Sequence, residues 1–196
     1  LVAAAERWPS RELDLVGVTG TNGKTSVVHL LDAVLERAGR TTATHGTLSG
    51  GRTTPEATDL QPLLRSWVAT GVDTAAIEVS SHALWQHRVD GTTFAAVGFT
   101  NLSRDHLDYH ESMDGYEAAK ARLFNGTFAD HAVVVVTDQA GRRMANRARE
   151  AAMTVVEVEE PPDVVVGPDR VRFGWRGRTI TVDTGGRFTV ANALVA

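Results

Sequence analysis

The sequence contains no cysteine among its 196 residues. Disulfides, iron–sulfur clusters, thiol nucleophiles and thiolate zinc sites are therefore excluded. No apolar run approaches the ~20 residues of a membrane-spanning helix. Residues 1–8 show no basic segment followed by an apolar one, so we expect no signal peptide. These absences favour a cytoplasmic protein that does not associate with a membrane.

The chain also lacks an excess of basic charge. It has 20 basic and 24 acidic side chains, which gives a formal net charge of −4. This balance argues against a nucleic-acid partner, although one local anion site remains compatible with it. With 42% hydrophobic and 22% charged residues the composition is globular. At ~150 residues per domain, the length predicts one main domain.

Apolar segments with strand character alternate with segments of helical periodicity. The predicted strands are 13–19, 72–79, 94–100, 132–137 and 154–158, and the predicted helices are 27–39, 60–68, 113–124 and 141–152. Such alternation predicts an α/β fold with a mostly parallel sheet and helices on both faces. Val133–Val136 is dense in β-branched residues, which is typical of a strand buried on both faces.

The pattern changes after Pro161 and Pro162. Short strands are predicted at 164–166, 171–175 and 179–182, separated by turn residues, which indicates a small antiparallel β appendage near the C-terminus. We therefore divide the chain into a lead-in at 1–12, a core at 13–160, an appendage of the same domain at 161–189, and the start of an apolar helix at 190–196.

A glycine-rich segment, Gly20-Thr-Asn-Gly-Lys-Thr25, lies between the first strand and the first helix. Glycines let backbone N–H groups converge on phosphate oxygens at a helix N-terminus. Lys24 can reach the outer phosphates and the Thr25 hydroxyl can coordinate Mg²⁺. The strict P-loop pattern fails because Val18 stands where its first glycine belongs. A nucleoside triphosphate remains favoured over a plain tight turn, and over a dinucleotide site because no G-x-G-x-x-G is present.

Two further strand ends carry polar clusters. Glu78 ends one strand and His106 follows the next, and both should lie at the same sheet edge as the glycine-rich loop. Their donor atoms suit a cation beside a triphosphate, although His is an uncommon Mg²⁺ ligand. By residue type alone, His106 is slightly better explained by a helix cap or by a position behind the metal ligands, and Asp105 and Asp108 equally suit the first turn of a helix. Lys120 alone is typical of a solvated helix lysine.

Together these segments resemble the Mur ligases. The segments are Gly20–Thr25, Thr53-Thr-Pro-Glu-Ala57, Glu78-Val-Ser-Ser-His82 with Gln86-His-Arg-Val89, Phe99-Thr-Asn-Leu-Ser-Arg-Asp-His-Leu-Asp-Tyr-His110 and Tyr116-Glu-Ala-Ala-Lys-Ala-Arg-Leu-Phe124. They are most similar to the branch that adds the third amino acid of the peptidoglycan stem peptide. The resemblance implies the central, P-loop NTPase-like ATP-binding domain of such an enzyme, with 1–12 and 190–196 leading to domains outside this chain.

The resemblance implies an ATP-dependent amide ligase. It would add meso-diaminopimelate or L-lysine to UDP-MurNAc-L-Ala-D-Glu through an acyl phosphate, acting as a monomer in cell-wall biosynthesis. Two Mg²⁺ ions beside a triphosphate would neutralise charge as the substrate carboxylate approaches.

The resemblance also assigns roles to individual residues. ATP would be bound by Gly20, Thr21, Asn22, Gly23, Lys24, Thr25, Ser26 and Asn101. One Mg²⁺ would be held by Thr25 and Glu78, and a second by His106. Lys120 would be carbamylated and act as a carboxylate-like metal ligand. The UDP-muramoyl-dipeptide would contact Thr53, Thr54, Ser80, Gln86 and Arg88. Lys24, Glu78, His106 and Lys120 form the implied catalytic set.

The sequence departs from the family pattern at two positions. Thr189 replaces an asparagine of the hinge motif, and Gln139 stands where an acidic residue is common; both concern the adenine side of the site. The alternatives are another ligase of the superfamily, namely folylpolyglutamate or cyanophycin synthetase, and a nucleotide-binding module without catalysis. The segments around Thr53 and Arg88 favour the muramoyl-peptide branch, and the complete catalytic set argues against the non-catalytic module.

Overall fold

The computed structural model describes residues 1–196, with every side chain except that of Leu107. Its centre is a six-stranded sheet with the order β2-β3-β1-β4-β5-β6, in which every strand pair is parallel. The strands are β1 (Asp14–Thr19), β2 (Thr42–His45), β3 (Thr74–Glu78), β4 (Ala96–Phe99), β5 (His131–Val135) and β6 (Thr154–Val158). The predicted α/β fold with a mostly parallel sheet is confirmed.

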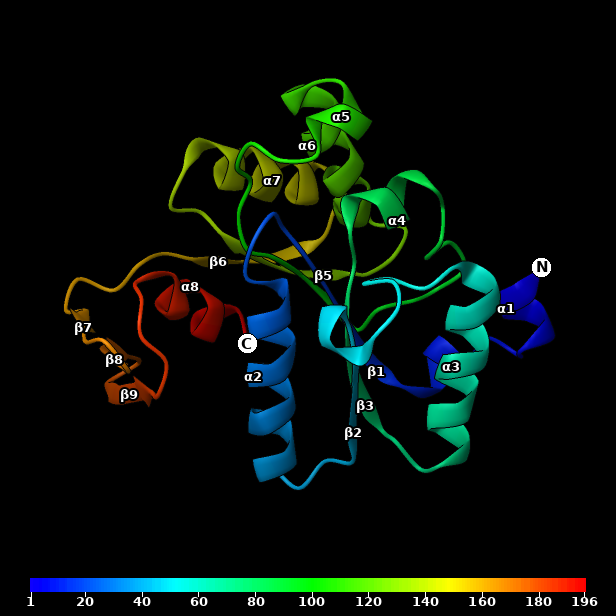
Figure 1. Cartoon of the computed structure of the whole chain (residues 1–196), viewed down its shortest axis with the longest axis horizontal. Helices are drawn as coiled ribbons and strands as arrows, with labels where there is room; N and C mark the ends of the chain where they lie inside the picture. Colours follow the sequence, from blue (N-terminus) through cyan, green and yellow to red (C-terminus); the bar gives the residue numbers. More distant parts are fainter.

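Helices cover both faces of this sheet (Figure 1). The helices α2 (Lys24–Arg37) and α8 (Phe188–Val195) pack on one face, and α3 (Ala57–Ala69), α6 (Met113–Ala121) and α7 (Gln139–Glu150) pack on the other. Alternation along the strands explains the division, because successive side chains of a strand point to opposite faces. In β1, Leu15 joins the core of α3 and α7, whereas Val16 and Val18 join the core of α2 and α8.

A second, three-stranded antiparallel sheet lies beyond α8, at the far left in Figure 1. It consists of β7 (Val165–Val166), β8 (Val171–Trp175) and β9 (Arg178–Val182). Its small core joins Val171 and Phe173 of β8 to Val190 of α8. The predicted appendage is confirmed, and α8 connects it to the main sheet because Val195 of the same helix lies in the core beside α2.

Short elements complete the chain. They are α1 (Val2–Ala5), α4 (Ser81–Trp85), α5 (Leu107–His110) and the 3₁₀ turns Pro9–Glu12, Thr47–Ser49 and Arg122–Phe124. The segment 1–12 packs on α3, where Arg65 donates to the backbone oxygens of Glu6 and Arg7. None of the helices that the structure describes is long and apolar enough to cross a membrane.

The sequence prediction missed α4 and α5, because each is too short to show helical periodicity. The first core helix begins at Lys24, three residues before the predicted start, because Gly23 caps it in the left-handed conformation. The predicted helix 113–124 is α-helical only to Ala121 and then tightens into a 3₁₀ turn. The start of α2 and the helices α4 and α5 follow the carboxyl ends of β1, β3 and β4, which is the edge of the sheet where the polar clusters were expected.

Candidate functional site

The loop between β1 and α2 has a backbone that glycine permits. Gly20 has a φ of +152°, and a Cβ there would overlap the Thr100 hydroxyl. Gly23 has a φ of +87° and a Cβ there would meet the Asn192 amide. The loop therefore lies tightly between the segment after β4 and helix α8. It places backbone N–H groups at the N-terminus of α2, where the helix dipole favours an anion.

Asn101 holds this loop in shape. Its side-chain oxygen accepts from the Asn22 backbone N–H at 3.0 Å, and its amide nitrogen donates to the Asn22 backbone oxygen at 3.0 Å. The Thr100 hydroxyl donates to the same oxygen at 2.6 Å, and the Thr21 N–H donates to the Asn101 backbone oxygen at 2.9 Å. In this structure Asn101 therefore fixes the loop, and its contact with a nucleotide stays a prediction.

Lys24 and Lys120 are the only lysines of the chain, and both donate to the backbone oxygen of Gly20. Lys24 Nζ lies 2.9 Å from this oxygen and also donates to the Thr21 oxygen at 2.9 Å. Lys120 Nζ lies 2.8 Å from the Gly20 oxygen, and its side chain is 1% exposed. The expectation of a solvated Lys120 from residue type alone is wrong, because α6 directs this side chain beneath the loop.

Burial shifts the pKa of both lysines downward. It lowers the pKa of Lys24, against the opposing attraction of Glu78 and Asp105. Burial, and then the charge of Lys24, lower the pKa of Lys120 to about 6. Lys120 Nζ also lies 4.3 Å from the ring centroid of Tyr116, whose hydroxyl hydrogen-bonds to that of Thr21 at 3.2 Å. At neutral pH, Lys120 is therefore mostly a neutral amine.

Glu78, at the end of β3, is a buried carboxylate with 1% exposure. It accepts from the Thr25 hydroxyl at 2.8 Å, and no Lys, Arg or His side chain that the structure describes lies within ion-pair distance of it. A buried carboxylate without a paired cation is costly. Carboxylate and hydroxyl oxygens are the ligands that Mg²⁺ prefers, so Thr25 and Glu78 fit such an ion.

His106 and Lys120 both lie near the ring of Tyr116. The His106 ring centroid is 5.9 Å from that of Tyr116. Within the described part of the chain, no group of three His, Asp or Glu side chains gathers as a metal site. The resemblance implies one Mg²⁺ at Thr25 and Glu78 and a second at His106 and Lys120. This pair of metal sites stays a prediction.

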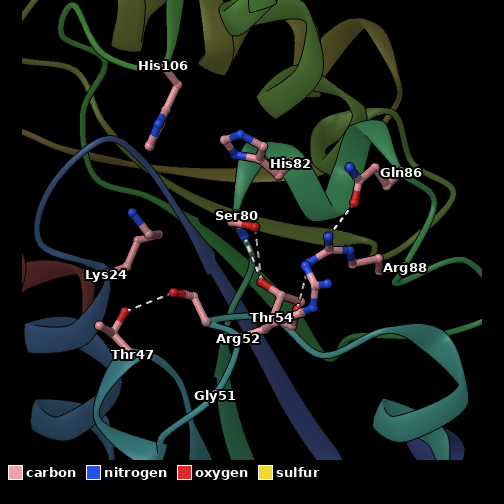
Figure 2. A pocket seen from close by; sticks show the side chains of 11 residues that line it. Lys24, Thr47, Gly51, Arg52, Thr54, Ser80, His82, Gln86, Arg88 and His106 are labelled. Atoms are coloured by element: carbon pink, nitrogen blue, oxygen red, sulfur yellow. Dashed lines mark hydrogen bonds between the residues drawn. The ribbon is translucent and has the colours of Figure 1, made fainter. Parts of the chain in front are cut away.

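A cleft of about 550 Å³ opens next to the loop (Figure 2). Figure 2 shows Lys24 and Thr47 on one side and Gln86 and Arg88 on the other, with His82 and His106 above. The fold thus brings together all five residues expected to contact the muramoyl-dipeptide, which are Thr53, Thr54, Ser80, Gln86 and Arg88. Thr54 fixes the floor, because its hydroxyl donates to the Glu78 backbone oxygen at 2.9 Å and accepts from the Ser80 N–H at 3.0 Å.

Arg88 is the buried cation of this cleft, with 7% exposure. Its Nη1 donates to the Thr54 oxygen at 3.1 Å, and its Nη2 pairs with Glu56 at 3.1 Å and donates to the Gln86 side chain. Its Nε is buried and has no hydrogen-bond partner in the described structure. A guanidinium at the wall of the cleft suits an anionic ligand group.

A second cavity, of about 600 Å³, lies at the other side of the loop. It is lined by four residues expected to bind ATP, namely Asn22, Gly23, Ser26 and Asn101, and by Leu102, Ser103, Asp138, Phe188 and Asn192. Phe188 is 66% exposed, and the buried Asn192 side-chain nitrogen has no hydrogen-bond partner in the described structure. A flat apolar ring beside free polar groups suits a nucleobase.

Sequence reasoning missed several residues of the site. Thr47 and His82 line the cleft, and Phe188, Asn192 and Asp138 line the second cavity. Burial, and then the neighbouring His106, lower the pKa of His82. His82 ends the segment Glu78–His82 that carries the resemblance, and Phe188 and Asn192 lie close to Thr189 of the hinge motif, so a signal was present for these three. At Thr189, where the family pattern has asparagine, the hydroxyl donates to the Gly185 oxygen at 3.0 Å.

Residues 18–196 match the family of the Mur ligase middle domain. A UDP-N-acetylmuramoyl-L-alanyl-D-glutamate–2,6-diaminopimelate ligase from Geobacter metallireducens is 40% identical, over 96% of this chain and 42% of that protein. The ligase of the same name from Bacillus licheniformis is 36% identical, over 96% of this chain and 43% of that protein. This chain therefore spans less than half the length of these curated relatives.

Solved structures agree with this likeness. A ligase of the same name has a TM-score of 0.83 at 27% identity, over 97% of this chain and 44% of that one. A folylpolyglutamate synthase from Mycobacterium tuberculosis shares the fold, with a TM-score of 0.74 at 17% identity over 99% of this chain and 55% of that one. The match over residues 18–196 and the two curated relatives show that the chain belongs to the Mur ligase middle domain family.

Proposed function

We propose that this chain is the ATP-binding and carboxylate-activating part of a ligase that adds an amino acid to UDP-MurNAc-L-Ala-D-Glu. The observation that carries the proposal is the shared position of three features. The phosphate loop, the buried Glu78 on Thr25 and the cleft with Arg88 meet at one sheet edge. The names of the two curated relatives support UDP-MurNAc-L-Ala-D-Glu as the substrate, and the 2,6-diaminopimelate in these names supports that amino acid.

In this proposal the two cavities hold the two large substrates. The cavity beside Phe188 and Asn192 takes the nucleoside of ATP, and the loop 20–26 takes the phosphates. The cleft beside Thr53, Ser80 and Arg88 takes the muramoyl-dipeptide. Lys24 lies between them and would leave the Gly20 oxygen for the outer phosphates. Its charge then stabilises the anions that approach one another.

Mg²⁺, when bound, would neutralise phosphate charge as the substrate carboxylate approaches. Thr25 and Glu78 would hold one ion, and His106 with a carbamylated Lys120 would serve the second. The neutral amine of Lys120 is the form that reacts with CO₂, forming an N–C bond and releasing a proton. Its lowered pKa and its burial support this modification.

We also propose that residues 1–12 and 190–196 connect this domain to further domains of a longer protein, which acts as a monomer in the cytoplasm. The chain's coverage of less than half of its relatives supports the first point. Completing the ligation would then need parts outside these 196 residues.

Calorimetry with the chain tests the nucleotide assignment. We expect Mg²⁺-ATP to bind, and Lys24→Ala to weaken binding by at least about tenfold, since a charge-assisted contact contributes ~1.5–3 kcal/mol. Arg147→Ala is the matched control, because Arg147 is exposed on α7 and has no ion pair in the described structure. Equal binding by the wild type and Lys24→Ala would contradict the proposal.

The same measurement with cleft ligands tests the substrate. UDP-MurNAc-L-Ala-D-Glu should bind to the wild type and more weakly to Arg88→Gln, while a folate should not bind. The opposite preference would instead favour a folylpolyglutamate synthase activity.

A further inference from the structure

The two carboxylate oxygens of Glu78 accept different numbers of hydrogen bonds. Oε1 accepts two short hydrogen bonds, from the Thr25 hydroxyl and from the Thr47 backbone N–H, both at 2.8 Å. Oε2 accepts one long bond, from the Thr47 hydroxyl at 3.3 Å. A carboxylate oxygen has two lone pairs. The free capacity of Glu78 is therefore on Oε2, and Thr47 is its neighbour there.

Thr47 has a second contact, which leads into the cleft. Its hydroxyl lies 3.1 Å from the hydroxyl of Thr53, and both side chains line the cleft (Figure 2 labels Thr47). A hydroxyl has a single proton. While Thr47 donates to Glu78, it has no proton left for Thr53, so Thr53 must be the donor of their shared bond.

We propose that Thr47 and Thr53 form a hydroxyl relay whose direction depends on whether Glu78 holds a divalent cation. Without the cation, Thr53 donates to Thr47 and Thr47 donates to Glu78. With a cation on Oε2, its positive charge repels the hydroxyl hydrogen that points at the same oxygen, and the Thr47 proton turns to Thr53. Thr53 then has its own proton free for an acceptor in the cleft. Thr47 is thus a positioning residue between the metal site and the cleft.

This inference rests on the proposed Mg²⁺ at Glu78. It predicts the direction in which the Mg²⁺ affinity changes in two variants. Thr47→Val removes a hydrogen bond that the cation must otherwise displace, so Mg²⁺ should bind more tightly. Thr53→Val removes the bond between the two hydroxyls in both states. Only in the cation-bound state does this leave the Thr47 proton without an acceptor, so Mg²⁺ should bind more weakly. In the double variant the change at Thr53 has no effect on Mg²⁺ binding, because the Thr47 hydroxyl is already absent. The double variant should therefore bind Mg²⁺ as tightly as Thr47→Val does.

The experiment measures how Mg²⁺ tightens ADP binding to the 196-residue chain, by calorimetry over a range of Mg²⁺ concentrations. The Mg²⁺ midpoint should fall by about twofold to fivefold in Thr47→Val and rise by a similar factor in Thr53→Val, the size expected for one long hydrogen bond. Thr47→Ser keeps the hydroxyl and should restore the wild-type midpoint. ADP binding in EDTA should be equal in all the variants.

Other outcomes separate the possible failures. If both single variants weaken Mg²⁺ binding, or if Thr53→Val acts equally in the Thr47→Val background, the relay is wrong although the metal site stands. Unchanged midpoints would likewise overturn the relay. If Mg²⁺ does not change the ADP affinity of the wild type, the proposed metal site is contradicted, and the relay with it.

Discussion

Among single residues, the two lysines show how little a residue type alone predicts. The chain has 20 basic side chains, yet its two lysines meet at one backbone oxygen. A lysine on a helix is ordinarily solvated, and only the path of α6 beneath the loop buries Lys120. The motif around Lys120 did single it out by resemblance. Thr47 had no such signal, because its contacts with Glu78 and Thr53 exist only after β2 and β3 have paired.

The proposed carbamate can be detected directly because so few amines compete for CO₂. With ¹³C-bicarbonate, we expect one carbamate resonance in the NMR spectrum at pH 7.5 besides any from the N-terminal amine. It should be absent in Lys120→Arg and retained in Lys24→Arg.

The pH dependence of this signal has a defined direction. The pKa of Lys120 is about 6, so the reactive amine is already the main form at pH 7.5. As the pH falls through 6, the ammonium form takes over and the resonance should disappear. A resonance that survives in Lys120→Arg, or one that appears only near pH 10, would show that another amine is modified.

At the scale of elements, the alternation of strands and helices was predictable and the short polar helices were not. Buried strands such as β3 carry their own signal in the sequence, since all five of its residues are buried. The helices α4 and α5 lie at the site, where polar side chains interrupt any apolar period. The shape of the glycine-rich loop depends on a third element, because Thr100 and Asn101 after β4 hold it.

Gly20→Ala tests this dependence on a neighbouring element. A Cβ at Gly20 would overlap the Thr100 hydroxyl, so we expect a loss of about 2–4 kcal/mol in the free energy of unfolding. ADP binding should weaken together with it. Gly39→Ala is the matched control, because Gly39 also has a positive φ, of +83°, but no atom within 4 Å.

That control variant should lose only about 1–2 kcal/mol, the cost of the left-handed backbone. Urea unfolding of both variants measures the difference. Equal losses in the free energy of unfolding would mean that the Thr100 side chain moves aside at little cost. The contact between Thr100 and the loop would then not stabilise the loop.

At the scale of the whole molecule, one helix belongs to two cores. Val195 of α8 packs beside α2 on the six-stranded sheet, whereas Val190 packs against β8 of the small sheet. The sequence showed the small sheet as a change in pattern after Pro162, and the last helix as a short apolar segment. It could not show that α8 joins the two, because that depends on which face of the helix each sheet covers.

Phe173→Ala tests whether the two sheets unfold separately. Phe173 is 1% exposed in the small core, so its truncation should cost about 3–5 kcal/mol there. In hydrogen exchange, we expect the amides of β8 and β9 to lose protection while those of β1 and β3 largely keep theirs. A uniform loss across both sheets would show that α8 makes them one cooperative unit.

The sharing of the Gly20 oxygen by both lysines has a consequence for the order of events. The charge of Lys24 helps to keep Lys120 neutral. A polyphosphate that draws Lys24 away would bring negative charge close to Lys120 and favour its ammonium form, which does not react with CO₂. The proposed carbamate would therefore have to form before the nucleotide arrives. An enzyme that binds ATP before CO₂ has reacted with Lys120 would show a lag before full activity. The length of this lag would depend on the order in which ATP and bicarbonate are added.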